Sequence, residues 1–565
     1  MSHAEEHRRL NALVRAADEY SQARRTASLE ALTESQKTGN AAFPAERFGR
    51  FTDYFQSPDF GVHAAQLPTG KVLLFSFLRV ETDPRKETGP TNTVGAANAG
   101  RAFLWDPAAG TSAAAFKDVK PPNVLVSDGS GVARPAPFFC SGHAFLPNGM
   151  LAVFGGNIGG KGGTGAKFSF VFDPWKETWY RNKDMAVGRW YPTAAEGPDG
   201  RVLILSGQSE EGYGHPTPAV ELFPAKAHPV PQGTSEVPEG IAAQLLKADG
   251  PYRNDYPHLF SLRDGRFYGL GRDADQQWAF DPVRETRSEL PRRPGNWRGY
   301  GSAVPLPAGQ RGPDSVLVMG GDAHDPGTFS FSAAGWRAEQ PRAFGRTQDN
   351  TVLLPDGRMV TVNGSVDSRD YGNGAFNPEA DLTYRQIETR DLDGRWTLGP
   401  SQRLPRGYHS NALLMPDGRV LVTGDDLQQV ANDPDIADAM DGSIELYEPA
   451  YLHRGQRPEL DTVPSGTVGY GTPFTAASGA ADRIARVVAI APSAVTHSVN
   501  TTQRYLELNI VSRTQTALTV QAPPTAADAP PGYYMVFALD SDGVPSRARW
   551  IRFGDKAPLD FLTSR

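Results

Sequence analysis

The stretch Leu146-Pro147-Asn148-Gly149 leads directly into the apolar run Met150-Leu151-Ala152-Val153-Phe154. An Asx-Gly pair favours a turn with a positive φ, and the run behind it is typical of a strand buried between sheets. The same phrase returns at Leu67–Gly70, Gly197–Gly200, Leu262–Gly265, Leu306–Gly309 (a looser copy), Leu354–Gly357 and Met415–Gly418. The copies lie roughly 40 to 80 residues apart, a spacing typical of kelch-type propeller blades.

This repeat predicts an all-β fold whose main domain is a seven-bladed kelch-type β-propeller over residues 46–455. Residues 1–45 carry apolar side chains at helical spacing and are expected to form a short helical N-terminal extension. The phrase stops after residue 455, and short strands between Pro and Gly turns predict an immunoglobulin-like β-sandwich over residues 456–565. The strands expected in that sandwich are 486–490, 505–510, 517–520, 533–539 and 549–553.

The composition of the 565 residues excludes several classes of protein. With 39% apolar and 21% charged residues, the chain can build a core and is not a disordered one. The net charge of -7 comes without a basic stripe, so we expect no nucleic-acid partner. No apolar run reaches about eighteen residues, so we expect no transmembrane segment. The single cysteine excludes intrachain disulfides and multi-cysteine zinc sites.

Four segments carry ligand-type side chains, three of them beside the start of a blade and one on a turn between strands of the sandwich. They are Phe138–His143, Gly188–Thr193, Arg406–Ser410 and Val495–Asn500. Taken singly, each is typical of ordinary packing, since a Tyr-His pair at a strand start usually makes one hydrogen bond and a buried cysteine is usually inert.

Together the four segments resemble the radical copper oxidases, the family of galactose oxidase and glyoxal oxidase, in its bacterial branch. The likeness runs from about residue 50 to the C-terminus and includes the order of the segments along the chain. It implies one copper ion held by Tyr191, Tyr408, His409 and His497, with the last of these supplied by the C-terminal domain. It also implies a thioether that joins Cys140 to Tyr191, which carries the radical.

The chemistry of these residue types agrees with that resemblance. Two imidazoles with phenolate or water oxygens form a set of N and O ligands that favours Cu(II). Oxidation of an alcohol or aldehyde removes two electrons, whereas Cu(II) accepts one, so a redox-active side chain must hold the second oxidising equivalent. The resemblance implies that Tyr191 holds it and that Tyr408 is the base that takes the hydroxyl proton. The predicted enzyme is an oxidoreductase that acts on a small aldehyde or primary alcohol and reduces O2 to hydrogen peroxide.

The chain departs from galactose oxidase where that enzyme places a tryptophan over the cross-link, because Ser206–Glu211 contains none. Two other indoles are candidates for this place. Trp297 lies in a region from which bacterial relatives supply the indole, and Trp190 adjoins the modified tyrosine. Trp190 can equally well be interpreted as an ordinary aromatic residue of the hydrophobic core.

Residues that would bind the substrate are harder to identify. The segment around Arg253 resembles the one that supplies a sugar-binding arginine in galactose oxidase, although the neighbouring Tyr256-Pro257 is more typical of glyoxal oxidases. His143 is either a pocket residue or a structural histidine near the site. Since the galactose-type tryptophan is missing, small aldehydes or primary alcohols are expected to be better substrates than galactose.

Two other functions were compatible with a propeller, which hosts binders as well as enzymes. One is a non-catalytic kelch-type glycan-binding or adhesion protein, for which carbohydrate is the partner. The other, a zinc or calcium hydrolase, lacks a carboxylate cluster beside the two histidines. The resemblance implies a secreted or cell-surface protein, although Met1–His7 lacks the apolar region of a secretory signal.

Overall fold

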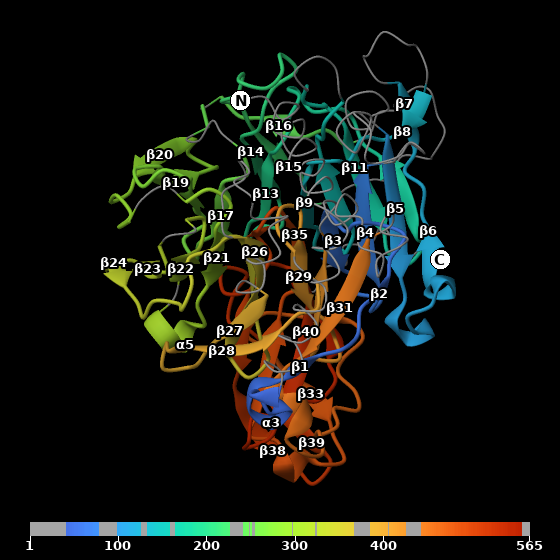
Figure 1. Ribbon diagram of the computed structural model, residues 1–565, viewed down its shortest axis with the longest axis vertical. Coiled ribbons are helices and arrows are strands. Elements are labelled where there is room, and N and C mark those ends of the chain that lie inside the picture. The colour runs from blue at the N-terminus through green and yellow to red at the C-terminus, as the bar shows by residue number, and fades with distance from the viewer. Residues whose placement is uncertain are drawn as a thin grey trace, which may run out of the picture.

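The computed structural model describes residues 41–77, 99–125, 133–158, 164–225, 241–247, 249–250, 255–295, 298–312, 314–322, 325–365, 385–404, 406–424 and 442–555. It is built almost wholly of strands, and the sheets of the N-terminal part stand above a C-terminal domain in Figure 1. None of the helices in these ranges is long and apolar enough to cross a bilayer. Residues 1–40 of the helical extension predicted over 1–45, and the segment that contains Arg253, lie outside the described residues.

Seven sheets of four to six strands follow one another in the described chain, and we number them 1 to 7. Sheets 1 and 2 contain β3 (His63–Gln66), β4 (Val72–Phe77), β5 (Gly100–Trp105), β6 (Phe116–Asp118), β9 (Gly142–Phe145), β10 (Leu151–Phe154), β11 (Ser169–Asp173) and β12 (Thr178–Arg181). Sheets 3 and 4 contain β13 (Thr193–Glu196), β14 (Val202–Leu205), β15 (Val220–Phe223), β16 (Gln244–Leu245), β17 (His258–Ser261), β18 (Phe267–Leu270), β19 (Gln277–Asp281) and β20 (Thr286–Glu289).

Sheets 5 and 6 contain β21 (Ser302–Pro305), β22 (Val316–Met319), β23 (Phe329–Ser332), β24 (Gly335–Ala338), β25 (Thr347–Leu353), β26 (Met359–Ser365), β27 (Gln386–Arg390) and β28 (Trp396–Ser401). Sheet 7 contains β29 (Asn411–Leu414), β30 (Val420–Thr423) and β31 (Ser443–Glu448), together with β1 (Arg50–Phe51) and β2 (Phe55–Gln56) from the start of the described chain. The innermost strands of neighbouring sheets contact one another, and separate apolar clusters fill the spaces between successive sheets. The predicted all-β propeller is therefore confirmed.

The last sheet is completed by strands from the other end of the chain. Arg50 of β1 pairs with Glu448 of β31, and Phe55 of β2 pairs with Ile444 of the same strand. The outer edge of sheet 7 is thus built from residues about 400 positions before its inner strands. Pairing of the two ends closes the ring and covers the edge of β31 that would otherwise be unpaired.

The repeated turns have the expected conformation. In sheet 2 the Gly149 amide donates to the Leu146 carbonyl at 2.8 Å, and Gly149 has a φ of 84°. The prediction of a tight turn was wrong for the looser copy, Leu306–Gly309. There the chain forms a single turn of helix, α5 (Ala308–Arg311), between β21 and β22. This copy has Ala308 where the others have Asp, Asn or Thr, so it lacks the side chain that accepts a backbone hydrogen bond in an Asx turn.

The C-terminal domain is the predicted sandwich. One sheet contains β32 (Thr467–Val468), β41 (Arg549–Phe553), β40 (Gly532–Leu539), β34 (Arg486–Ile490) and β37 (Tyr505–Leu508), and the other contains β33 (Pro473–Ala477), β39 (Ala517–Gln521) and β38 (Ile510–Arg513). The single strand expected over 505–510 is in fact two, because the chain passes from one sheet to the other at Asn509. The domain boundaries at residues 45 and 455 stay predictions.

The turn that carries His497 does not belong to either sheet of the sandwich. Its strands, β35 (Ala494–Thr496) and β36 (Val499–Asn500), extend sheet 1 of the propeller instead. β35 pairs antiparallel with β3, with Thr496 opposite His63. The hairpin therefore rises from the sandwich into the centre of the ring, where Figure 1 places β35 among β3, β9 and β29.

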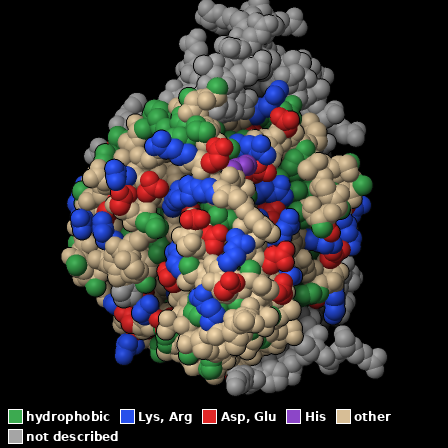
Figure 2. All heavy atoms as spheres, turned by 90° about the horizontal axis from the view of Figure 1, so that it is seen from below, with side chains coloured by type: hydrophobic (Ala, Val, Ile, Leu, Met, Phe, Trp, Pro, Cys, Tyr) green, Lys and Arg blue, Asp and Glu red, His purple; other side chains and the backbone are tan. Residues whose placement is uncertain are grey.

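The lower face of the molecule carries charges of both signs. Figure 2 shows basic and acidic side chains interspersed on this face, with no continuous basic stripe.

Buried arginine–glutamate ion pairs link the segments within three of the sheets, at the same end of each sheet. In sheet 6 the Arg346 guanidinium donates to the Asn363 carbonyl at 2.9 Å and to the Gln386 carbonyl at 3.1 Å, and it pairs with Glu388 at 2.8 Å. Glu388 also accepts the Ala343 amide at 2.7 Å. Sheets 3 and 7 repeat the arrangement with Arg189–Glu221 and Arg406–Glu445. Each pair joins the loop before an inner strand to the next two strands of its sheet.

Substitution Glu388→Gln is expected to destabilise the fold by about 3–5 kcal/mol, because it leaves the Arg346 charge buried without its counter-ion. The measurement is the midpoint of thermal unfolding. Asp393→Asn is the control, since it makes the same chemical change in the exposed Arg395–Asp393 pair and should leave the midpoint almost unchanged. Equal shifts in the two variants would contradict the proposed role of the buried pair.

Candidate metal centre

One residue in each of the seven sheets adopts a left-handed backbone conformation beside the propeller axis. It lies two positions before the inner strand, or at the second position of β25 in sheet 6, and its φ lies between 43° and 71°. We call these residues the axial residues, and they are Gly61, Cys140, Tyr191, Tyr256, Tyr300, Gln348 and His409. Non-glycine residues adopt this conformation infrequently, and such residues cluster at functional sites.

Three of the residues singled out from the sequence, Cys140, Tyr191 and His409, are axial residues, and Tyr408 directly precedes one. His497 arrives from the β35–β36 turn, where it too is left-handed, with a φ of 49°. The repeated backbone geometry at the start of each inner strand thus directs chemically unlike side chains toward one axis.

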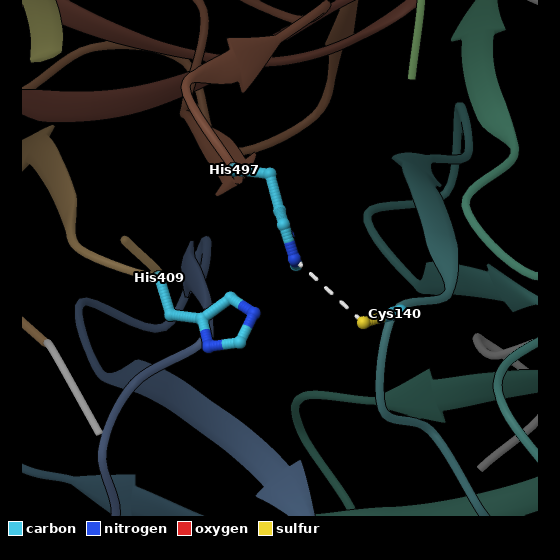
Figure 3. A group of neighbouring side chains, drawn as sticks. All are labelled: Cys140, His409 and His497. Atoms are coloured by element: carbon cyan, nitrogen blue, oxygen red, sulfur yellow. Dashed lines mark hydrogen bonds between the residues drawn. The ribbon is translucent and has the colours of Figure 1, made fainter. Parts of the chain in front are cut away.

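These side chains meet in a compact group. The Tyr191 and Tyr408 hydroxyls are 3.0 Å apart, within hydrogen-bonding distance. The sulfur of Cys140 and one ring nitrogen each of His409 and His497 lie within 4.8 Å of one another. Figure 3 shows the two imidazoles and the sulfur pointing toward a common centre, with the Cys140 sulfur 3.7 Å from Nε2 of His497. The five residues are at most 2% exposed, so the group is withdrawn from bulk water.

The hydrogen bonds of Thr496 settle which nitrogen of His497 faces this centre. The Thr496 hydroxyl donates to the Val62 carbonyl at 2.8 Å, so toward Nδ1 of His497, at 2.7 Å, it can only accept. Nδ1 therefore carries the proton, and Nε2 presents its lone pair toward Cys140 and His409. Fixing the tautomer through the second nitrogen is how proteins prepare a histidine for metal binding.

The donor set fits copper. Two imidazole nitrogens and two phenol oxygens come together in a buried group, and a tetragonal set of N and O ligands favours Cu(II). Cys140 lies next to Tyr191, since the Tyr191 amide donates to the Cys140 carbonyl at 3.0 Å and both side chains belong to one buried cluster.

Of the two tryptophans considered, Trp190 stacks on Tyr191, with ring centroids 4.9 Å apart and an interplanar angle of 19°. Trp190 is buried, and its backbone amide donates to the Gln208 carbonyl. Trp297 and Arg253 lie outside the described residues.

His143 lies behind Cys140 and not among the ligands. Its Nε2 is 3.2 Å from Nδ1 of His63, and its ring meets Phe75 edge-on. Burial lowers the pKa of His143 to about 3, which keeps the imidazole neutral. The contacts of His143 are those of a structural histidine beside the site.

Sequence reasoning missed three axial residues, Tyr256, Tyr300 and Gln348. The Tyr256 ring is 4.7 Å from that of His497, and its hydroxyl donates to the Ser141 carbonyl at 2.8 Å. Tyr300 packs edge-on against Tyr408 at 5.6 Å, with the Arg272 guanidinium 4.6 Å above its ring. Burial raises the pKa of Tyr256 well above its ordinary value, so its phenol stays protonated. Their shared signal was their place at the start of an inner strand, two positions before it for the tyrosines and at its second position for Gln348.

Comparison with known proteins agrees with this geometry. Residues 457–553 match the family model of the galactose oxidase-like Early set domain. Over 544 residues the chain is 26% identical to galactose oxidase of Gibberella zeae, covering 90% of this chain and 71% of that protein. Over 481 residues it is 28% identical to aldehyde oxidase GLOX1 of Arabidopsis thaliana, covering 76% of this chain and 74% of the relative.

The fold also has a solved counterpart. A fungal alcohol oxidase of the AA5 family, in complex with copper, superposes with a TM-score of 0.69 at 20% identity, covering 90% of this chain and 100% of the other. At this identity the match establishes the fold. The matched C-terminal domain and the relatives that span the propeller show that the chain is similar to galactose oxidase-like proteins along most of its length.

Proposed function

We propose that this protein is a mononuclear copper radical oxidase. It oxidises a small aldehyde or primary alcohol by two electrons and reduces O2 to hydrogen peroxide, and a Cys140–Tyr191 thioether is its second redox group. The printed activities of the relatives, galactose oxidase and aldehyde oxidase, support this class of reaction.

The observation that carries the proposal is the convergence of one thiol, two phenols and two imidazoles from four distant segments at a single buried point. A glycan-binding propeller needs a polar, accessible surface and gains nothing from a dry group of this composition. The left-handed backbone at Cys140, Tyr191, His409 and His497 supports the same conclusion, because strained residues persist where the surrounding structure holds them for a function.

His409, His497, Tyr191 and Tyr408 would hold the copper ion. When bound, copper(II) accepts one of the two electrons of the oxidation and raises the acidity of a bound hydroxyl group. Thr496 keeps Nε2 of His497 unprotonated for this purpose.

The thioether would form between the Cys140 sulfur and a ring carbon of Tyr191. One S–H and one ring C–H bond break and one C–S bond forms, so two electrons and two protons leave the protein. O2 accepts them and becomes hydrogen peroxide. The sulfur donates electron density to the phenol ring, which makes Tyr191 easier to oxidise to a radical.

Catalysis would then divide the two hydrogens of the substrate between the two tyrosines. Tyr408 takes the hydroxyl proton of the alcohol, or of an aldehyde that has added water, at its phenol oxygen, and the Tyr191 radical takes a hydrogen atom from the adjacent carbon. The distance of 3.0 Å between the two hydroxyls places both acceptors at one substrate carbinol. Both hydrogens return with two electrons to O2, which leaves as hydrogen peroxide.

The surroundings favour a small substrate. Tyr256 and Tyr300 add further rings beside His497 and Tyr408, so the centre is lined by aromatic side chains. Trp190 covers one face of Tyr191 and would shield the radical from solvent. Arg253 remains a proposed contact for the substrate.

Cys140→Ser should abolish both the cross-link and the oxidase activity. The test compares the intact masses of wild-type and variant proteins after copper loading in air, together with hydrogen peroxide release from primary alcohols and aldehydes. Wild-type protein is expected to lose two hydrogens, whereas the variant keeps its full mass. Peroxide release by Cys140→Ser at the wild-type rate would contradict the proposed role of the thioether.

Tyr408→Phe should still form the cross-link, because it leaves Cys140 and Tyr191 intact. Its kcat is expected to fall by about 100-fold or more, since the base that receives the hydroxyl proton is gone. Steady-state peroxide release measures kcat. Tyr470→Phe is the control, as it removes a hydroxyl that bonds only within the sandwich, to the Ala529 carbonyl. Unchanged kcat in Tyr408→Phe would show that another group takes the proton.

A further inference from the structure

The axial residues are joined to one another by a recurring backbone hydrogen bond. The Tyr191 amide donates to the Cys140 carbonyl at 3.0 Å, and the Tyr256 amide donates to the Tyr191 carbonyl at 2.9 Å. The Gln348 amide donates in the same way to the Tyr300 carbonyl at 2.7 Å. In these sheets the amide of one axial residue is therefore held by the backbone of the axial residue before it.

Cys140 does not follow this pattern, because its amide donates to Nε2 of His63, at 3.1 Å, and so to a side chain of the preceding sheet. The Gly61 amide also departs from it and donates to Oδ1 of Asp59, at 2.8 Å. His63 is the first residue of β3 and is fully buried. The Cys140 amide is thus held by a buried side chain, whereas the amides of Tyr191, Tyr256 and Gln348 are held by backbone carbonyls.

The surroundings of His63 fix its ring firmly. Because Nε2 accepts a hydrogen bond from the Cys140 amide, the hydrogen of His63 must be on Nδ1, which donates to Nε2 of His143 at 3.2 Å. The ring stacks on Phe75 with centroids 4.6 Å apart and an angle of 10°. Burial lowers the pKa of both imidazoles, which agrees with this neutral pair.

The same segment of sheet 1 also holds the other parts of the site. The Val62 carbonyl accepts from the Thr496 hydroxyl, which orients His497, and from the Asn411 side chain at 2.8 Å. Asn411 lies two residues after His409, so Val62 and His63 together contact three of the converging segments.

We propose that His63 is a positioning residue that directs the sulfur of Cys140 toward Tyr191 for thioether formation. The inference rests on the proposed function. A left-handed residue can place its side chain on the axis only while its backbone is held, and the hydrogen bond from the Cys140 amide to His63 holds the amide side of this residue, as the bond from the Tyr191 amide holds its carbonyl. His63 bonds to the backbone of Cys140 and is not among the proposed copper ligands, so it acts before catalysis, when the cofactor matures.

The experiment follows maturation in protein prepared without copper. Copper(II) is added in air, and the loss of two hydrogens is followed by intact mass in the wild type, His63→Phe, His63→Gln and His258→Phe. Copper affinity is measured in parallel against a competing chelator. His258 is the matched control because it is the first residue of the inner strand in sheet 4 and bonds to the Gly301 carbonyl at 2.9 Å, away from Cys140.

His63→Phe keeps the ring on Phe75 but removes the acceptor, so cross-linking is expected to slow by about tenfold or more at unchanged copper affinity. His63→Gln keeps an acceptor at the position of Nε2 and should restore most of the rate, and His258→Phe should mature like the wild type. Maturation of His63→Phe at the wild-type rate would overturn the positioning role and leave the proposed function standing. Equal slowing in His63→Phe and His258→Phe would overturn it too, since the cause would be general loosening of the inner strands. A wild-type protein that never loses two hydrogens would overturn both proposals.

Discussion

The pairing of β35 with β3 is the contact on which the metal centre depends. It carries His497 out of the sandwich and into the propeller, where no other described segment of the C-terminal domain supplies a side chain to the group of ligands. The same pairing brings Thr496 to the Val62 carbonyl, which sets the tautomer of His497. Two domains that could each bury a core of their own are thus made interdependent by one short hairpin, and the sandwich is part of the site because of it.

The left-handed axial residues are the second feature on which the candidate site depends. Six of the seven are not glycine, and each is held in an unfavourable conformation by bonds to its neighbours. The buried pairs Arg189–Glu221, Arg346–Glu388 and Arg406–Glu445 fasten the loops that lead into these positions. The rigidity of the ring therefore permits a geometry that an isolated strand would not keep, and this geometry allows side chains with different chemistry to occupy equivalent positions.

The turns of the propeller and the residues of the candidate site could be predicted from the sequence, because the information for them lies in short segments. The Pro-Asx-Gly turns specify hairpins through the conformation of a few consecutive residues, and the motifs around Cys140, Tyr191, Tyr408 and His497 are short. The rest depends on contacts between distant segments. Nothing near Val495 indicates that its strand joins the sheet of β3, and nothing near His63 indicates a bond to Cys140. Tyr256 and Tyr300 become visible only when the equivalence of all seven strand starts is known.

Closure of sheet 7 by β1 and β2 has a consequence for how the protein is made. The partner of Arg50 is Glu448, so the first described strands leave the ribosome long before the residue they pair with exists. Domains fold as they emerge during synthesis, but this ring stays open until nearly the whole propeller has been translated. The proposed ligand His497 lies later still in the chain. A nascent chain that has not reached residue 497 therefore lacks one of the proposed copper ligands, so the complete ligand set can assemble only after the propeller has been made.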